Sequence, residues 1–308
     1  MNKENIKFDV VIIGGSYAGL SAAMALGRAL RNVLVIDSGK PCNAQTPHSH
    51  NFITQDGETP AAIAAKAKEQ VMQYPTVQFL NDIAVAVTGE NSNFSVSTSA
   101  GLTIHAKKLL FATGVKDIMP AIEGFAACWG ISVIHCPYCH GYEYKSQPTG
   151  ILMNGDMAID MAELIENWTS QLTIFTNGKS TISNSRLEQF LELSQVQVVE
   201  KEISSFQHIG GQLQYIEFTD GSAQKLDAIY ARPAFVQQSN IPELLGCNFT
   251  EAGYLAVNDM QQTNIPGVYA AGDNITMRRA VSGAVATGGF AGAMINHELI
   301  ADKFGRHS

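Results

Sequence analysis

"FDVVIIGGSYAGLSAAMALGRALRNVLVID", residues 8–37, decides the fold of this chain. Its first six residues are apolar and rich in β-branched side chains, which predicts a buried strand. Gly14 and Gly15 then make a turn, and the small apolar residues from Ala18 onward are typical of a closely packed helix. A second apolar strand follows and ends at Asp37. Strand, glycine turn, helix, strand and acid, in this order, predict a dinucleotide-binding βαβ unit.

The chemistry of this unit is specific. The turn brings backbone N–H groups and a helix N-terminus to a pyrophosphate, and small residues let the backbone approach it. Asp37 follows Gly14 by about 23 residues, close to the spacing at which an acid binds the adenosine ribose. Ser16 stands where the G-x-G-x-x-G pattern has its second glycine, but serine is small and can bond phosphate. An ordinary glycine-rich βα turn would use the same residues, so the turn alone leaves both interpretations open.

Two further strand ends carry similar signals. Residues 107–115, "KKLLFATGV", form a predicted strand that closes on Ala112, Thr113 and Gly114. Residues 265–274, "IPGVYAAGDN", form another that ends in Gly272 and Asp273. The segment "RRAVSGAVATGGFAGAMINHEL" that follows predicts a helix of small residues, suited to running close to a ligand or to another backbone.

The middle of the chain repeats the strand–turn–helix–strand pattern. "TGILMNGDMAIDMAELIENW" begins at Thr149, and "LTIFTNG" supplies the next strand. The expected glycine triplet here reads Met153-Asn154-Gly155, and the second strand ends without an acid for NAD or an arginine for NADP. A second dinucleotide-type domain is predicted, with NAD(P)H as a doubtful cofactor.

These patterns predict an α/β fold of two Rossmann-like domains, the second inserted in the first. Residues 1–118 and 243–308 are expected to form the discontinuous nucleotide-binding domain. Residues 119–242 are expected to form the inserted, NAD(P)H-binding-like domain. Pro120 and Pro242 lie near the two expected crossings.

Composition limits the functions that the chain can have. The 308 residues carry a net charge of −8 and no basic run, which argues against nucleic acid and anionic membranes as partners. No apolar stretch is long enough to span a bilayer. The N-terminal segment lacks the apolar region of a signal peptide, and the odd count of 5 cysteines does not suggest a disulfide scaffold. A cytoplasmic location is predicted.

"HCPYCH", residues 135–140, has three interpretations: covalent haem attachment, a zinc site or a redox pair. Covalent haem attachment normally follows export, and the sequence does not predict that this chain is exported. Structural zinc needs four ligands, usually from a second Cys pair that is missing here, and the flanking histidines abut the cysteines too closely for easy tetrahedral geometry. A redox pair of Cys136 and Cys139 remains, with no metal. Cys128 and Cys247 are interpreted as buried apolar residues, and Cys42 as accessible.

Taken together, the order of motifs resembles the low-molecular-weight thioredoxin-reductase flavoproteins over nearly the whole chain. The Gly14–Gly19 turn, Asp37, the Ala112–Gly114 strand end, the Cys-x-x-Cys and the Ala271–Asp273 strand end carry this resemblance. "CPYCHGYE" and "HSHNFITQDG" are similar to the subgroup that contains the gliotoxin- and holomycin-type dithiol oxidases. The resemblance implies FAD as cofactor and a homodimer.

The resemblance also implies roles for the redox motif. Cys139 would face the flavin, and Cys136 would attack the substrate sulfur. His140 replaces the acid of ordinary thioredoxin reductases, and an imidazole there can move protons between thiols near neutral pH. A protonated histidine would also favour the thiolate form of a neighbouring cysteine.

For the flavin, the resemblance implies contacts along the strand ends. Asp273 would bond the ribityl chain, and Arg279-Ala280-Val281 would lie along the pyrimidine edge. His48 and His50 lie on the flavin-side loop of the family and can be read either as flavin neighbours or as structural histidines. The full set of expected FAD-binding residues is Gly14, Gly15, Ser16, Ala18, Gly19, Asp37, Ser38, Asn43, His48, His50, Ala112, Thr113, Gly114, Gly272, Asp273, Arg279, Ala280 and Val281.

Three functions fit the sequence. The first is an FAD-dependent thiol/disulfide oxidoreductase with weak or no use of NADPH, acting on a small dithiol or disulfide or on a thioredoxin-like protein. It would be either a dithiol oxidase or a reductase with another electron donor. The second is an NAD(P)H-dependent disulfide reductase with a divergent nucleotide site, in which Thr176 and Asn177 could bond a ribose. The third is a non-enzymatic, flavin-binding redox sensor.

Overall fold

The computed structural model describes residues 7–306, and the chain divides into two units. The first unit runs up to Ala44 and then comprises Pro60–Lys116 and the chain from Phe235 onward. The second comprises Gln45–Thr59 and Asp117–Ala234. Residues 45–59 were expected in the first domain, and the expected crossings lay near residues 118 and 242. Residues 45–59 belong to the second unit because Gln45 donates hydrogen bonds to the carbonyl oxygens of Ala126 and Trp129.

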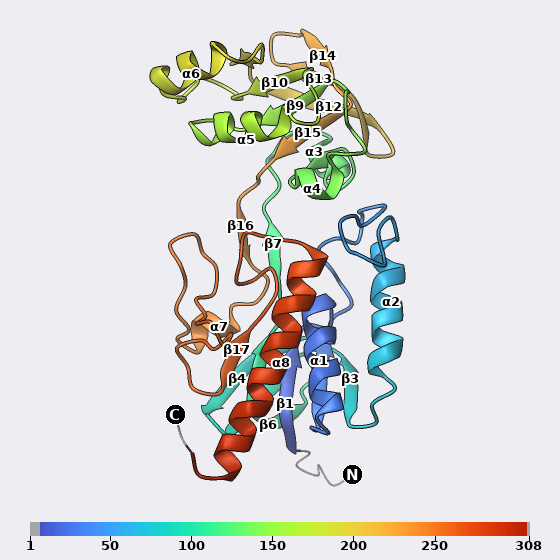
Figure 1. Ribbon diagram of the computed structural model, residues 1–308, viewed down its shortest axis with the longest axis vertical. Helices are drawn as coiled ribbons and strands as arrows, with labels where there is room; N and C mark the ends of the chain where they lie inside the picture. Colours follow the sequence, from blue (N-terminus) through green and yellow to red (C-terminus); the bar gives the residue numbers. More distant parts are fainter. Residues whose placement is uncertain (1–6, 307–308) are drawn as a thin grey trace. The chain divides into compact units, whose positions relative to one another are not determined.

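The first unit contains a mixed sheet with the strand order β3-β2-β1-β6-β5-β4, and β17 pairs with β6 (Figure 1). The strands β3, β2, β1, β6 and β17 run parallel, and β4, β5 and β6 run antiparallel. The bounds are β1 (Lys7–Ile13), β2 (Val33–Asp37), β3 (Val77–Asn81), β4 (Ala84–Glu90), β5 (Asn93–Thr98), β6 (Thr103–Phe111) and β17 (Val268–Ala270).

Apolar layers cover both faces of this sheet. In β1, Val10, Val11 and Ile12 are fully buried, as expected for a parallel strand with neighbours above and below. Three helices belong to the unit's parallel half: α1 (Tyr17–Arg28), α2 (Pro60–Val71) and α8 (Val281–Lys303) (Figure 1). The short helix α7 (Ile241–Leu244) contributes Ile241 to the layer that also contains Val11.

Helices α1 and α8 touch through their backbones. A Cβ on Gly288 would overlap the carbonyl group of Ala18, and a Cβ on Gly292 would come within 2.8 Å of the carbonyl oxygen of Ala22. The small-residue helix predicted from the sequence is therefore explained by its contact with another helix.

Lys108, on β6, is a buried cation in this unit. Its side chain is fully buried, and its Nζ lies 2.5 Å from Glu298 Oε1 and 2.7 Å from Asp302 Oδ2, both on α8. It also donates to Asn91 Oδ1 at 2.7 Å. Burial of an ammonium group is tolerated because these acceptors surround it. The cluster fixes the C-terminal part of α8 to the sheet.

The second unit contains a five-stranded parallel sheet with the order β11-β10-β9-β15-β8 and a three-stranded antiparallel sheet with the order β12-β13-β14. Strands β7 (Val115–Asp117) and β16 (Phe235–Gln237), at the crossings, form a separate two-stranded sheet. The remaining bounds are α3 (Phe125–Cys128), β8 (Val133–Ile134), α4 (Pro137–His140), β9 (Thr149–Leu152), α5 (Met157–Ile165), β10 (Leu172–Phe175), α6 (Asn184–Leu191), β11 (Gln197–Val199), β12 (Ile203–Ile209), β13 (Gln212–Phe218), β14 (Ala223–Lys225) and β15 (Ala228–Ala231).

The α/β class predicted from the sequence is confirmed, since each unit contains parallel strands with a strand–turn–helix–strand core. Within residues 7–306, no helix has both the length and the apolar character needed to cross a bilayer.

Replacing Lys108 with methionine is expected to lower the free energy of unfolding by about 3 kcal/mol, because Glu298 and Asp302 lose their shared cation. Lys107→Met is the control: Lys107 pairs with Asp9 but is 43% exposed, and such pairs contribute at most ~1 kcal/mol. Urea unfolding followed by fluorescence measures both. Equal effects of the two substitutions would contradict the role given to Lys108.

Candidate active site

The carboxyl ends of four parallel strands meet at one edge of the first sheet. Ile13 of β1 is paired with Ile36 of β2 and with Phe111 of β6, and Phe111 is paired with Ala270 of β17. The segments that follow these strands are the ones in which the sequence predicted nucleotide contacts. The structure thus brings together Gly14, Gly15, Ser16, Asp37, Ser38, Ala112, Thr113, Gly114, Gly272 and Asp273, each at or just beyond the end of a strand.

The glycine turn after β1 leaves no room for side chains. Gly14 has a φ of +106°, and a Cβ there would overlap the Ala112 carbonyl. A Cβ on Gly15 would lie 2.9 Å from the Cβ of Asp37. Ser16 is the N-cap of α1, and its side chain makes no capping hydrogen bond. The backbone of the turn therefore lies directly against the acid, with the start of α1 available to an anion, which fits a dinucleotide.

The opposite side of this edge is formed by the turn after β17. Gly272 has a φ of +91°, and its N–H donates to Thr287 Oγ1 at 3.1 Å, which ties the turn to α8. Asn274 is fully buried, and its Nδ2 donates to the Phe111 carbonyl at 2.9 Å. Asn274 thereby connects the β17 turn with the end of β6. The sequence analysis missed it, although a polar residue directly after Asp273 at a strand end was a signal.

The remaining predicted flavin residues of the first unit flank this edge. Ala18 and Gly19 lie in the first turn of α1, and a Cβ on Gly19 would overlap the Gly14 carbonyl. Asn43 Nδ2 lies 3.4 Å from the Tyr17 hydroxyl. Arg279, Ala280 and Val281 lead into α8, and the Arg279 guanidinium lies 5.8 Å from the centre of the Phe235 ring.

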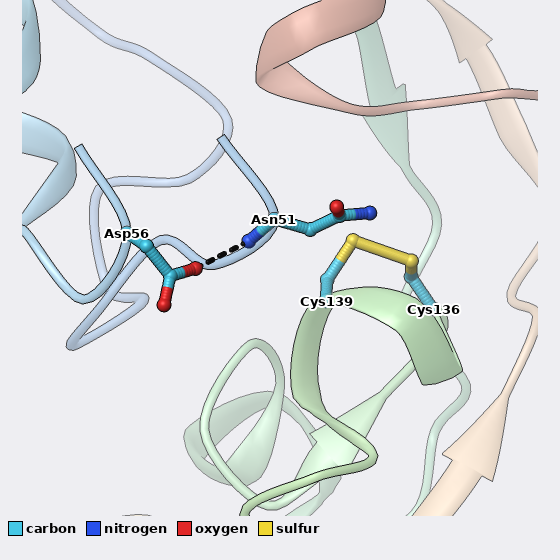
Figure 2. Close-up of a disulfide and its surroundings, with 4 residues drawn as sticks. All are labelled: Asn51, Asp56, Cys136 and Cys139. Carbon is cyan, nitrogen blue, oxygen red and sulfur yellow. Dashed lines mark hydrogen bonds between the residues drawn. A yellow bond between two sulfur atoms is a disulfide. The ribbon is translucent and has the colours of Figure 1, made fainter. Parts of the chain in front are cut away.

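The redox motif lies in the second unit. Cys136 and Cys139 form a disulfide with a Cα–Cα distance of 5.3 Å (Figure 2). Cys136 is the N-cap of the one-turn helix α4, and Pro137 is its first residue. The N–H of His140 donates to the Cys136 carbonyl at 3.2 Å. Proline suits the first helical position because an N–H there would have no partner within the helix. The disulfide holds both sulfurs on one side of this very short helix.

The loop Gln45–Thr59 belongs to the second unit and packs against α3 and α4. Gln45 Nε2 donates to the carbonyl oxygens of Ala126, at 3.2 Å, and of Trp129. The loop brings His48 and His50 beside His140. The structure therefore places both histidines with the redox motif, and their predicted approach to the flavin remains a prediction.

His50 lies between two carboxylates. Its Nδ1 is 3.7 Å from Asp56 Oδ1, and its Nε2 is 3.5 Å from Glu143 Oε1. Its ring meets the ring of His140 edge-on, with the centroids 6.4 Å apart. Asp56 is oriented by the N–H of Asn51, which donates to Asp56 Oδ1 at 2.7 Å (Figure 2).

Burial is the main influence on the pKa of His140 and lowers it from the ordinary value. The Glu143 carboxylate and a hydrogen bond with the backbone of His48 act in the opposite direction, and His50 lowers the pKa further. The lowered pKa keeps the imidazole neutral near pH 7, where it can accept a thiol proton.

An open pocket of about 310 Å³ lies beside the disulfide, entirely within the second unit. Its aromatic lining includes Tyr138 and Trp168, whose rings meet edge-on at 5.6 Å. The complete lining is His50, Asn51, Asp56, Pro137, Tyr138, Cys139, Tyr142, Glu143 and Trp168. Sequence reasoning assigned no role to Asn51, Asp56 or Glu143, because their proximity depends on the loop packing against α4.

Comparisons with known proteins agree with this geometry. The family model for pyridine nucleotide-disulphide oxidoreductases matches residues 8–288. The chain belongs to this family. Thioredoxin reductase tcpT of Claviceps purpurea is 34% identical over 318 residues, which cover 100% of this chain and 99% of the relative.

Solved structures give the same result. The oxidoreductase from Agrobacterium tumefaciens has a TM-score of 0.89 and 34% identity, covering 96% of this chain and 99% of that one. HlmI has a TM-score of 0.90 and 30% identity, covering 99% of this chain and 96% of that one. These comparisons confirm the resemblance to thioredoxin-reductase-like flavoproteins and the prediction of an oxidoreductase enzyme. They do not support a sensor without catalysis.

The family name implies a pyridine nucleotide, but the turn in the second unit does not fit one. Asn154 Oδ1 accepts the N–H groups of Gly155 and Thr181, each at 2.8 Å, and its Nδ2 donates to the Lys179 carbonyl at 2.9 Å. The Asp156 carboxylate, at the start of α5, accepts the Ser183 N–H at 2.8 Å. The protein's own side chains occupy the phosphate-binding positions of the turn, and Asp156 would repel a phosphate.

The polar side chains that follow β10, the second strand of this dinucleotide-type unit, are also bonded within the protein. The Thr176 hydroxyl donates to the Gly178 carbonyl at 2.6 Å, and Asn177 Oδ1 accepts the Ile203 N–H at 2.7 Å. Arg186 is paired with Asp160 at 2.5 Å. Thr176 and Asn177, the side chains proposed as ribose ligands, are therefore engaged within the protein, and so is the nearby Arg186.

Outside the disulfide, the three other cysteines differ in exposure. Cys42 is exposed, whereas Cys128 and Cys247 are buried, and burial raises the pKa of both buried thiols. A raised pKa reduces the thiolate fraction at any given pH, so these two thiols are expected to be inert. Among residues 7–306, no cluster of three or more His, Cys, Asp and Glu side chains has the arrangement of a metal site.

In the oxidised, folded protein, iodoacetamide is expected to label Cys42 alone. Brief reduction with dithiothreitol should add Cys136 and Cys139, because opening the disulfide releases both thiols. Peptide mass spectrometry identifies the labelled residues, and labelling in urea after reduction with dithiothreitol provides the control in which every cysteine reacts. Labelling of Cys128 at the rate of Cys42 in the folded protein would show that this assignment is wrong.

Proposed function

We propose that this protein is an FAD-dependent thiol/disulfide oxidoreductase that oxidises a small dithiol and does not take electrons from NAD(P)H. The observation that carries the proposal is the Cys136–Cys139 disulfide beside His140, in a chain whose second dinucleotide turn is filled by Asn154 and Asp156. FAD, when bound, accepts the two electrons of the Cys136–Cys139 dithiol and passes them to an acceptor such as O₂, which becomes peroxide.

The residues of the first unit support FAD as the cofactor. Gly14 and Gly15 would carry the pyrophosphate at the start of α1, and Asp37 would bind the adenosine ribose. Asp273 and Arg279, beside the β17 turn and before α8, would hold the flavin end. Each of these roles follows from the position of the residue at the strand ends and from the family resemblance.

The protein residues would carry out the thiol exchange. With the roles that the family resemblance implies for the two cysteines, a substrate thiol would give its proton to His140 as its sulfur bonds to Cys136. The Cys136–Cys139 bond would break with Cys139 leaving as thiolate. The second substrate thiol then attacks the mixed disulfide and releases Cys136. The substrate loses two electrons and two protons and becomes a disulfide. The first proton goes to His140 and the second to the released Cys136, so that Cys136 becomes a thiol and Cys139 remains a thiolate.

The pocket supports a small substrate over a protein. Its volume of about 310 Å³ suits a small molecule, and its aromatic lining suits an apolar or aromatic skeleton around the two thiols. The exposed aromatic rings of Tyr138 and Tyr142 at its rim would stack on such a skeleton.

The first test is anaerobic reduction of the flavin in the purified protein. Dithiothreitol is expected to bleach the oxidised flavin band, whereas NADPH and NADH are expected to leave it unchanged over the same time. Cys139→Ser should abolish the bleaching, since no disulfide can form, and Cys42→Ser should leave it unchanged.

Rapid bleaching by NADPH would overturn the proposal and favour the nucleotide-dependent reductase, because the filled turn would then have opened to admit the nucleotide. Bleaching by dithiothreitol in Cys139→Ser at the wild-type rate would exclude the disulfide as the route of the electrons.

A further inference from the structure

His140 is placed to accept a proton but has no direct route to solvent. Both of its ring nitrogens are buried. A base that acts once in each turnover must pass its proton on before the next one, so neighbouring groups have to carry it away. The residues around His140 therefore determine whether it can work repeatedly.

The charged and titratable groups that affect His140 come from two segments. Glu143 follows α4, and His50 lies on the loop Gln45–Thr59, while His48 meets His140 through its backbone. Asp56 is connected to these residues through its contact with His50. Side-chain exposure increases outward, from 22% for His50 to 37% for Glu143 and 67% for Asp56. The groups thus form a graded series from the buried imidazole to the pocket and solvent.

We propose that His50 and Glu143 form a relay that carries the proton of the reacting thiol from His140 to solvent. The inference rests on the proposed thiol exchange and adds two positioning residues to it. His50 receives the proton on one ring nitrogen and releases it from the other to a carboxylate, Glu143 or Asp56. Water takes up the proton at the exposed carboxylate, so the relay residues return to the protonation states in which they began.

The His50 ring is close to both carboxylates but has no direct hydrogen bond to either. Both carboxylate contacts of His50, at 3.5 and 3.7 Å, are longer than a direct hydrogen bond of about 2.7–3.2 Å. The rings of His50 and His140 meet edge-on with their centroids 6.4 Å apart, so the two imidazoles are direct neighbours. The His50 ring is thus near its partners without being locked to one of them.

Other bonds hold the loop in place, so His50 is not needed for its folding. The N–H of Ser49 donates to the Glu58 carbonyl at 2.8 Å, and the N–H of Gly57 donates to the Ser49 carbonyl at 2.9 Å. His48 Nδ1 lies 2.9 Å from the Gly57 carbonyl oxygen. Substitutions of His50 are therefore expected to leave the loop folded.

The test compares His50→Ala, His50→Gln and Glu143→Gln with the exposed controls His297→Gln and Glu251→Gln in the flavin-loaded protein under anaerobic conditions. Dithiothreitol is the probe. Two rates are measured from about pH 5.5 to about pH 9: flavin bleaching, and opening of the disulfide by acid quench and alkylation. The second rate is read from the protein's sulfurs and not from the flavin absorbance.

His50→Ala and Glu143→Gln are expected to slow disulfide opening by roughly 10-fold, within the range of acid–base effects, and added imidazole should restore much of the rate of His50→Ala. The acid limb of the pH profile should move to lower pH in Glu143→Gln, because Glu143 raises the pKa of His140. In His50→Gln it should move to higher pH, because His50 lowers that pKa.

Rates and profiles that match the controls would overturn the relay. Slower opening without imidazole rescue and without a shift of the acid limb would also overturn it, in favour of a packing role. A wild-type protein whose disulfide does not open with dithiothreitol would instead contradict the proposed function, so the two failures are distinguishable.

Discussion

Close approach between backbones, with no side chain between them, is the constraint on which the first unit depends. Gly14 lies against the Ala112 carbonyl, Gly19 against Gly14, and Gly288 against Ala18. These contacts bring the turn after β1, the end of β6 and helix α8 together around the start of α1. A methyl group at any of them would separate the strand ends that have to converge, so packing and nucleotide binding impose the same requirement on the sequence.

The second unit repeats the topology with the opposite outcome. Its turn after β9 contains Asn154 and Asp156, whose side chains bond to the segment after β10. In the first unit the corresponding positions are glycine and serine, and the backbone groups face an open edge. The same βαβ geometry thus offers a binding edge in one unit and a closed, self-bonded turn in the other. Side-chain length at two positions accounts for the difference.

The sequence predicted the features that follow a local period or motif: the strand at residues 8–13, the glycine turn, the acid at Asp37 and the Cys-x-x-Cys. It did not predict that Gln45–Thr59 packs with the inserted unit, because the bonds from Gln45 to Ala126 and Trp129 join residues more than 80 positions apart. The sequence also did not predict the burial of Lys108, because two adjacent lysines are normally expected to face solvent. Long-range partners, and not local propensity, decided both cases.

The packing of the loop 45–59 changes the surroundings of the redox motif. Cys136, Cys139 and His140 lie within five residues, but the motif alone leaves the imidazole in a buried position with one nearby carboxylate, Glu143. The loop adds His50 and Asp56, and the N–H of Asn51 orients that second carboxylate. A disulfide needs only two cysteines to form, whereas repeated proton transfer needs neighbours that exchange protons with water. In the proposed function, the electron chemistry would thus be encoded in one short motif, and the proton chemistry would depend on a segment about 85 residues earlier that meets it only in the folded unit.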